Sequence, residues 1–368
     1  MKTYTTKNLV RDQLAPLQLI DRPMPEPADD EVQIRVMAIG VNRADYFIRI
    51  GRYSLDESDK DNYGIEMAGF VTKVGANVTK WKVGDSVCAL TTRSSAYAEY
   101  TVAPASLLMK VPDGMSFAEA ASLPVGLVTG WYNIFKSGSL KSGQKLLVHG
   151  GASGMGVLAI QMAKAMGAEV FATAGGVEHC FLCRDLGATA IDYKIGEDFV
   201  TLGPYNVIYD ILGGGEYFRR NIEALYVGGS LRVLSFLGGN KTPNGIRLNK
   251  LHKPGGQFAV SKQAILDALD DEFNGDGVDL FDLAKRLNIR ATDHIYIGGN
   301  SIRRLDLDTK AEIVAAINQK IMPLVIDGKI KPVIAAEVPF KEAERAHQLI
   351  VGSHTGKIVL TVPNNLVR

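Results

Sequence analysis

The stretch Lys145–Gly176 constrains the fold of this chain more than any other. It reads KLLVHGGASGMGVLAIQMAKAMGAEVFATAGG. An apolar run leads into a glycine-rich turn, apolar residues then recur at helical spacing, and a second apolar run ends in Gly175-Gly176. This order predicts a β-α-β crossover, the unit that joins two parallel strands. It is typical of one half of a nucleotide-binding domain.

The turn of this unit, residues 150–156, reads GGASGMG. Small residues allow the backbone to approach a pyrophosphate, and the N–H groups at the start of the next helix attract anions. Ser153 stands where the strict G-x-G-x-x-G pattern has its second glycine, so the turn alone is weak evidence. A serine-hydrolase elbow is an alternative, but Met155 occupies its last glycine position. The flanking strands and helix favour dinucleotide binding.

Length and charge bound the class of protein. The chain has 368 residues, enough for two domains, and a formal net charge of +1. A balanced charge argues against nucleic-acid and membrane-surface partners, so we expect a small-molecule substrate. The N-terminal stretch lacks the apolar core of a signal peptide, and no segment approaches the length of a membrane span. We therefore expect a cytoplasmic protein.

Cysteines and histidines give no indication of a metal site. The three cysteines cannot form a disulfide framework, although Cys180 and Cys183 make a C-x-x-C. Both lie in VEHCFLCRDLGA, which reads as a helix, so we interpret them as packing residues; a zinc ribbon would need a second pair. The six histidines are scattered singly. The sequence predicts no bound metal.

The two halves of the chain differ in pattern. The first predicts short strands at residues 31–38, 68–74, 86–90 and 96–102. Ser116 followed by Glu119 predicts a helix start with a capping box. From about Leu127, helices alternate with strands at residues 189–192, 206–212 and 230–234. The fold class is therefore α/β, a β-rich domain plus a doubly wound parallel sheet that binds ligands at the carboxyl ends of its strands.

The chain resembles the medium-chain dehydrogenases/reductases of the zinc-independent quinone oxidoreductase branch, over nearly its whole length. The motifs that carry the resemblance are GVNRAD (40–45), RIGRY (49–53), GIEMAG (64–69), VGDSV (83–87), AYAEY (96–100), HGGASGMG (149–156), ATAG (172–175), Gly213-Gly214 and GKIVL (356–360). The resemblance implies a GroES-like catalytic domain, residues 1–126 completed by 331–368. It also implies a Rossmann-type NADP-binding domain, residues 127–330, and a homodimer or homotetramer.

The resemblance also shows what this chain lacks and adds. The zinc alcohol dehydrogenases of the same fold have a cysteine near the position of Asn42 and a histidine near that of Ile65, and both are absent here. Residues 240–277 look like an insertion relative to the family pattern. Such a segment could be a lid, an oligomer contact or a surface excursion.

Candidate site residues follow from the resemblance and from the switch-point rule. In the family, the residue at the position of Asn42 lies near the nicotinamide, and the one at the position of Tyr53 lines the acceptor pocket. The alternative for Asn42 is a turn residue that bonds to its own backbone, and for Tyr53 a half-buried aromatic side chain. Asp45 and Glu66 could be mistaken for an acid-base pair, but we interpret them as structural, paired with backbone or with an arginine such as Arg49. The expected cofactor-binding residues are Asn42, Thr129, Gly151, Ala152, Ser153, Gly154, Met155, Gly156, Gly175, His179, Tyr193, Lys194, Gly213, Ser235 and Phe236.

The end of the second strand of the β-α-β unit indicates which cofactor is preferred. NAD-selective sites have an Asp or Glu there, but this strand ends in Thr173-Ala174-Gly175-Gly176. That leaves room for a 2′-phosphate, to which Tyr193 and Lys194 could supply a hydroxyl and a charge. This strand end predicts NADPH as the cofactor. The resemblance implies a reductase of quinones or α,β-unsaturated carbonyls that needs no metal. An enoyl or 2-alkenal reductase of a specialised pathway and a non-catalytic dinucleotide-binding homologue remain alternatives.

Overall fold

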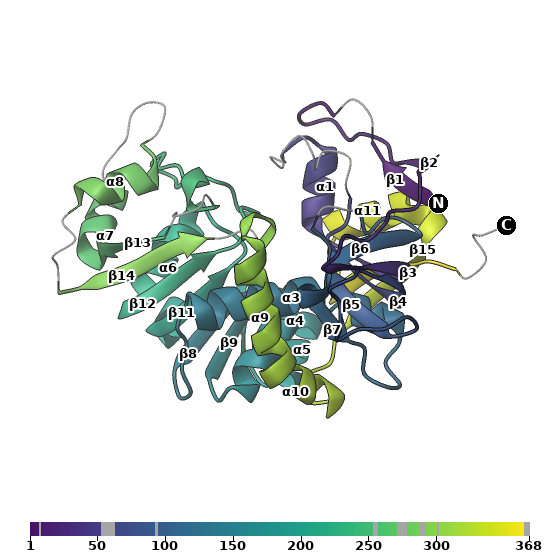
Figure 1. The fold of residues 1–368 in the computed structure, drawn as a ribbon. Coiled ribbons are helices and arrows are strands. Elements are labelled where there is room, and N and C mark those ends of the chain that lie inside the picture. The colour runs from purple at the N-terminus through teal and green to yellow at the C-terminus, as the bar shows by residue number, and fades with distance from the viewer. Residues whose placement is uncertain are drawn as a thin grey trace. The chain divides into compact units, whose positions relative to one another are not determined.

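The computed structural model describes residues 1–6, 9–52, 63–92, 95–252, 257–270, 278–287, 292–299 and 302–363. The chain divides into two compact units (Figure 1). Unit 1 comprises Met1–Val128, Ser153–Met155 and Leu307–Arg368, and unit 2 comprises Thr129–Ala152 and Gly156–Asp306. Unit 1 takes the chain up again at Leu307, earlier than the expected residue 331, because the helix that begins there packs on unit 1: Asn318 Nδ2 donates to Leu108 O at 3.1 Å.

Unit 1 is built on an antiparallel sheet with the strand order β15-β16-β3-β4-β5-β7, and β6 also pairs with β3. The β15–β16 pair is parallel. The strands of this sheet are β3 (Glu31–Val41), β4 (Glu66–Val74), β5 (Ser86–Leu90), β6 (Tyr100–Pro104), β7 (Leu108–Lys110), β15 (Ile334–Pro339) and β16 (Lys357–Thr361). β1 (Lys2–Thr5) and β2 (Gln18–Asp21) form a separate antiparallel pair.

Several helices accompany this sheet: α1 (Arg43–Arg49), α2 (Phe117–Ala121), α9 (Leu307–Lys320), α10 (Met322–Ile326) and α11 (Ala343–Val351), with the 3₁₀ turns η2 (Ala105–Leu107) and η8 (Phe340–Glu342). The predicted capping box at the start of α2 is confirmed. Glu119 N–H donates to Ser116 Oγ at 3.2 Å, and Ser116 N–H donates to Glu119 Oε2 at 2.9 Å. α3 (Pro124–Gly130) crosses the boundary between the units.

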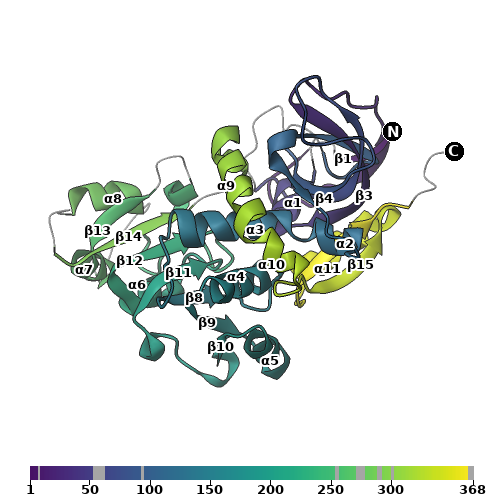
Figure 2. The ribbon, with the colours of Figure 1, turned by 60° about the horizontal axis from the view of Figure 1, so that its bottom comes forward.

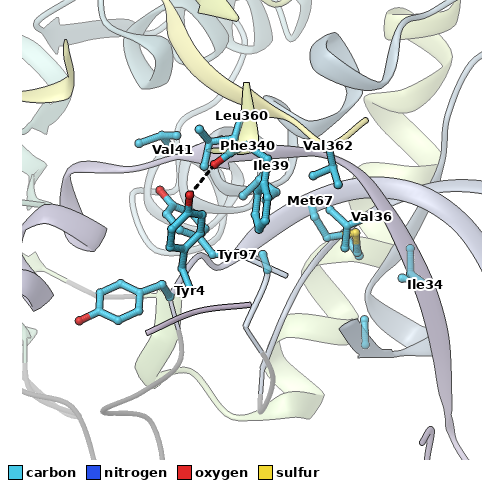
Figure 3. Close-up of a cluster of buried hydrophobic side chains, with 14 of the residues drawn as sticks. Tyr4, Ile34, Val36, Ile39, Val41, Met67, Tyr97, Phe340, Leu360 and Val362 are labelled. Atoms are coloured by element: carbon cyan, nitrogen blue, oxygen red, sulfur yellow. Dashed lines mark hydrogen bonds between the residues drawn. The ribbon is translucent and has the colours of Figure 1, made fainter. Parts of the chain in front are cut away.

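The core of unit 1 contains buried side chains of β3, β4 and β16 together with side chains of the C-terminal segments around β15 and α11. Ile34, Ile39 and Leu360 have no exposed surface, and each fully buried aliphatic side chain contributes about 1.5–3 kcal/mol. Figure 3 shows these residues together with Tyr4, whose hydroxyl donates to Phe340 O at 3.0 Å. The N-terminal strand is thereby attached to a segment more than 300 residues away in the sequence.

Unit 2 contains the predicted doubly wound sheet. Its order is β10-β9-β8-β11-β12-β14-β13, and all neighbours are parallel except the β13–β14 pair. The strands are β8 (Lys145–His149), β9 (Glu169–Ala174), β10 (Thr189–Asp192), β11 (Tyr205–Asp210), β12 (Leu225–Val233), β13 (Phe258–Ser261) and β14 (His294–Gly299). β5 and β10 have the predicted bounds, whereas β6 starts at Tyr100 and not at residue 96.

The connections of unit 2 are mostly helical (Figure 2). They comprise the π-helical segment η3 (Trp131–Lys136), α4 (Gly154–Ala165), α5 (Val177–Asp185), η4 (Tyr193–Ile195), η5 (Val200–Leu202), α6 (Glu216–Ala224), η6 (Asn249–His252), α7 (Lys262–Asp270), α8 (Leu280–Arg286) and η7 (Ile302–Arg304). α4 is buried over most of its length, from Gly156 to Ala163, which explains its nearly unbroken apolar sequence.

Residues 240–277 are more than a surface excursion, which corrects that alternative. Their described part contributes β13 to the edge of the sheet and α7 beside it. Ile246, Leu248, Val260 and Ile265 have no exposed surface and belong to the core of unit 2. The described part of the segment therefore helps to stabilise unit 2.

Candidate functional site

The glycine turn connects β8 to α4. Gly150 has a φ of +70°, a region that favours glycine. Gly151 N–H donates to Thr173 O at 2.9 Å, which attaches the turn to the end of β9. A Cβ at Gly151 would lie 2.6 Å from Cys183 Sγ, and one at Gly156 would collide with Gly150 O. The turn is therefore packed too closely for side chains at these positions, and it leads directly into the start of α4; helix starts of this kind attract anions.

The middle of the turn lies against the start of β16. Ser153 forms an isolated parallel bridge with Gly356, and both belong to unit 1. A Cβ at Gly154 would lie 3.1 Å from Lys357 Cδ. Ala152 is buried and Met155 is half-buried. A bulky side chain at residue 154 would have to displace the Lys357 side chain.

The end of β9 is next to the 3₁₀ turn that follows β10. The Tyr193 hydroxyl lies directly over the backbone of Gly175, and Lys194 Nζ lies 3.8 Å from the place of a Cβ at Gly176. Asp192 Oδ1 accepts from the N–H groups of Gly176 (3.0 Å) and Lys194 (2.9 Å). The Gly176 and Lys194 N–H groups hold the pKa of Asp192 below its usual range. The structure thus gathers the predicted phosphate-side residues, with the nearby carboxylate engaged by backbone.

His179 also lies at this place. Its Nδ1 is 3.0 Å from Gly175 O, so that nitrogen donates to the carbonyl and the ring stays beside the β9 terminus. His179 is half-buried, whereas the neighbouring Glu178 is exposed. That these residues bind a dinucleotide stays a prediction.

The turn after β11 contacts the loop after β12. Gly213 has a φ of +81°, and a Cβ there would lie 2.7 Å from Ser235 O and 2.7 Å from Phe236 Cδ1. Phe236 stacks on His252 with 4.5 Å between ring centroids. Burial lowers the pKa of His252 to about 4, so its imidazole is neutral near pH 7. Three of the predicted positions, Gly213, Ser235 and Phe236, therefore meet at the carboxyl edge of the sheet.

Thr129 lies at the end of α3, where unit 2 begins. Only 5% of its surface is exposed, and its carbonyl accepts from Asn133 Nδ2 at 2.9 Å. Tyr53, the other residue predicted from the family, lies outside the described residues.

Asn42 belongs to a buried cluster within unit 1. Its Nδ2 donates to Gly40 O at 3.2 Å and to Glu66 Oε1 at 2.9 Å, and its Oδ1 accepts from Lys357 Nζ at 2.7 Å. Lys357 Nζ is also 2.5 Å from Glu66 Oε1, and Glu66 Oε2 accepts from Val125 N–H at 2.7 Å. Glu66 has no exposed surface. We call Asn42, Glu66 and Lys357 the buried triad.

The triad limits the chemistry available to Asn42. Both hydrogens of its amide are engaged, so Asn42 has no N–H left to donate to a substrate carbonyl. Glu66 is held by a cation and two N–H donors, and its charged partner is Lys357, where an arginine was expected. Asp45 accepts from the backbone of Asn42 (2.9 Å) and Gly64 (3.2 Å). Arg49, the arginine expected beside Asp45 or Glu66, forms an ion pair with Glu344 at 2.8 Å.

Sequence reasoning missed Lys357 as a site residue, although it lies in the quoted GKIVL motif. It also missed a polar network under the glycine turn formed by His149, Thr173, Asp210 and Asn221. Two sequence signals were available: Lys357 stands between a glycine and an apolar strand, and His149 stands at the end of a strand.

The described ranges contain no group of three or more His, Cys, Asp or Glu side chains that could hold a metal ion. Cys88, Cys180 and Cys183 are free and buried, and Cys180 and Cys183 lie in α5 as predicted. Burial raises the pKa of Cys183 to about 12. Within the same described part of the chain, no helix combines the length and apolar character needed to cross a bilayer.

Comparisons with known proteins give consistent results. Residues 28–113 match the family model for the alcohol dehydrogenase GroES-like domain, and residues 154–261 match the model described as zinc-binding dehydrogenase. A 2-methylene-furan-3-one reductase of Solanum lycopersicum is 30% identical over 352 residues, covering 92% of this chain and 73% of that protein. A highly reducing polyketide synthase of Cordyceps militaris is 31% identical over 342 residues, covering 92% of this chain and 12% of that protein.

Among solved structures, the quinone oxidoreductase of Escherichia coli in complex with NADPH has a TM-score of 0.75 at 24% identity, covering 98% of this chain and 100% of that chain. This likeness shows that the two proteins share a fold. The chain spans 12% and 14% of the lengths of two polyketide synthases that it matches. The predicted fold class, a GroES-like domain plus a Rossmann-type domain, is confirmed.

Proposed function

The chain belongs to the medium-chain dehydrogenase/reductase family, and on that basis we propose that it is an NADPH-dependent, metal-independent reductase of a quinone or an α,β-unsaturated carbonyl compound. When bound, NADPH supplies the hydride. Both acceptor classes have a C=C bond conjugated to a carbonyl, and both are reduced by one hydride and one proton. An enone takes the hydride at its β-carbon and the proton at its α-carbon, whereas a quinone becomes a hydroquinone with both new hydrogens on oxygen. The protein's main task is then to hold cofactor and acceptor in position.

The arrangement at the end of β9 carries the proposal. A 2′-phosphate needs a cation, a hydroxyl and a nearby backbone without a free carboxylate, and Lys194, Tyr193 and Gly175-Gly176 supply these. Asp192, the carboxylate beside them, is engaged by two backbone N–H groups. The Escherichia coli quinone oxidoreductase, which has a similar fold, was solved in complex with NADPH, and this agrees with the proposed cofactor.

Measured dissociation constants test the cofactor preference. A charge-assisted contact to the phosphate contributes about 1.5–3 kcal/mol, so we expect NADPH to bind about ten- to a hundred-fold more tightly than NADH. Lys194→Ala and Tyr193→Phe should weaken NADPH binding and leave NADH binding unchanged, as followed by nicotinamide fluorescence. Equal affinities in the native protein would refute the preference, and unaltered NADPH affinity in both variants would show that the phosphate site is misplaced.

Tyr53 and Asn42 are proposed to shape the acceptor and nicotinamide site without acting as acids. The engaged amide of Asn42 supports this for that residue. We expect Tyr53→Phe to alter the ranking of acceptors more than the best rate, because one neutral hydrogen bond is worth about 1 kcal/mol. Loss of activity towards every acceptor by several orders of magnitude would identify Tyr53 as a proton donor.

The identity of the acceptor is open between two related classes. The tomato relative is named for reduction of a methylene ketone, which favours an enone, and an enoyl or 2-alkenal reductase fits the same site. NADPH oxidation with a panel of quinones, 2-alkenals and cyclic enones, each at the same concentration, compares them directly. Turnover of quinones alone would exclude the enone assignment.

Metal independence is proposed because asparagine and isoleucine stand at positions 42 and 65, where the family's zinc enzymes have cysteine and histidine. Dialysis against a strong chelator should leave turnover unchanged. Loss of activity that added zinc restores would contradict this.

A non-catalytic dinucleotide-binding protein is the second candidate. It predicts tight NADPH binding with no oxidation by any member of the acceptor panel.

We also propose a homodimer or homotetramer, which light scattering tests against the monomer mass of 39.8 kDa.

A further inference from the structure

A buried network of polar side chains underlies the glycine turn in unit 2. His149, the last residue of β8, has no exposed surface. Its Nδ1 is 3.0 Å from Thr173 Oγ1, and its Nε2 is 2.7 Å from Asn221 Oδ1. Asn221 Nδ2 donates to Asp210 Oδ2 at 3.2 Å. Such a network rigidifies its surroundings when every member is satisfied.

The direction of each hydrogen bond follows from the acceptor at one end. Both carboxylate oxygens of Asp210 accept, from Leu212 N–H at 2.7 Å and from Gly213 N–H at 3.1 Å, so the Asn221 amide must face it with nitrogen. The oxygen of that amide then accepts from His149 Nε2–H. His149 Nδ1 is left as an acceptor for the Thr173 hydroxyl. The Thr173 oxygen in turn accepts from Gly150 N–H at 3.3 Å.

This chain of bonds joins three segments of the candidate cofactor site. Gly150 opens the glycine turn, Thr173 lies near the end of β9 and Gly213 belongs to the turn after β11. The three strands are neighbours in the sheet, in the order β9-β8-β11. The network therefore lies under the carboxyl edge, where the doubly wound fold binds nucleotides.

We propose that His149, acting through Thr173 and Asn221, is a positioning residue that holds the glycine turn and the Gly213 turn in the geometry required to bind the cofactor pyrophosphate. This inference rests on the proposed NADPH-dependent function. His149 contacts the side chains of Thr173 and Asn221, and its role is to keep the two turns ordered before the cofactor binds, because ordering them on binding would cost binding free energy.

The surroundings of His149 keep it neutral. Phe199 and Tyr217 pack edge-on at 4.9 and 5.5 Å between centroids, and Arg220 lies over the Phe199 ring. Burial lowers the pKa of His149, against the opposing effect of Asp210. A neutral ring with hydrogen on Nε2 is the form that the network needs.

A matched pair of substitutions at Thr173 tests the inference. Thr173→Val preserves the branched shape but removes the hydroxyl that both donates to His149 and accepts from Gly150, whereas Thr173→Ser keeps it. We expect the NADPH dissociation constant, measured by fluorescence, to rise about ten-fold in the Val variant. The Ser variant should stay within about three-fold of the native protein. In turnover, KM for NADPH should rise in the Val variant while kcat is unchanged, because the proposed role of the network is to position the turns for binding. His294→Gln, a histidine of unit 2 outside the network, is the control.

Nuclear magnetic resonance gives a second readout, which does not depend on measuring NADPH affinity. In ¹⁵N–¹H long-range spectra of the native protein, the signal absent from a His149→Gln variant should show the neutral Nε2–H tautomer. An Nδ1–H tautomer or an imidazolium at pH 7 would overturn the inference, as would equal NADPH affinity in the Val and Ser variants. If the native protein binds no NADPH, the proposed function fails; if it binds NADPH but the Thr173 pair do not differ, the positioning role fails.

Discussion

Replacing Lys357 by Met removes a positive charge from the buried triad and leaves the Glu66 carboxylate, which has no exposed surface, without its cation. Breaking a buried ion pair on one side costs about 3–5 kcal/mol. Glu66 retains two donors, Asn42 Nδ2 at 2.9 Å and Val125 N–H at 2.7 Å. The expected loss of unfolding free energy is therefore at the lower end, about 3 kcal/mol.

A double-mutant cycle separates the pair from the individual residues. Glu66→Gln alone leaves the lysine charge buried and should cost about as much as Lys357→Met. The double variant contains no buried charge in the pair, and the carbonyl of the introduced glutamine can still accept from Val125 N–H. The two single losses sum to about 6 kcal/mol. We expect the double variant to lose at least about 2 kcal/mol less than this sum, and the difference is the coupling energy of the pair.

Urea unfolding in a Trp131→Phe background gives the measurement. The chain has two tryptophans, and Trp81 then reports on unit 1, which contains the triad. Lys73→Met is the matched control, because Lys73 pairs with Glu26 at 2.7 Å with both side chains at least half exposed. That change should stay within about 1 kcal/mol of the native value. A Lys357→Met loss no greater than the control, or a coupling energy below about 0.5 kcal/mol, would refute the reasoning.

Three further predictions concern both units. Gly156→Ala should weaken NADPH binding at least about ten-fold, because its Cβ would collide with Gly150 O, whereas Gly352→Ala, where the nearest atom is 3.5 Å away, should bind normally by the same fluorescence titration. Burial lowers the pKa of His347 to about 3. Below about pH 6.5 the unfolded chain protonates His347, whereas the folded protein keeps it neutral down to about pH 3. The free energy of unfolding is therefore unaffected by His347 above about pH 6.5 and falls by up to about 1.4 kcal/mol per pH unit between about pH 6.5 and pH 3. Urea titrations should show a smaller loss of unfolding free energy between pH 7 and pH 5 in His347→Gln than in the native protein. Thiol-reactive dye at pH 8 should label the folded protein slowly and all three cysteines in urea, since burial raises the pKa of Cys88 and of Cys183 to about 12; rapid labelling of the folded protein would contradict the buried placement.

Features that depend on neighbouring residues could be predicted from the sequence. The capping box of Ser116 and Glu119, the strands β5 and β10 and the strand-turn-helix around Gly150–Gly156 all follow from periodicity and from backbone chemistry over a few residues. Residues 96–99 mark the limit: they have strand-like composition, but β6 begins at Tyr100. Ala98 forms an isolated bridge with Thr3 instead, a partner far away in the sequence.

Partners that are distant along the chain depended on the tertiary structure. Lys357 and Asn42 are 315 residues apart, and His149 and Asn221 are 72 residues apart. No local pattern indicates that a buried lysine will be neutralised by Glu66, or that a strand-end histidine will bridge a threonine and an asparagine. The same holds for residues 240–277, whose strand β13 pairs with β14. Burial removes water from polar groups, and each must then bond to whatever the fold places within reach. Periodicity and glycine positions therefore assigned the elements and the glycine turn, whereas the packed chain selected the residues that support them.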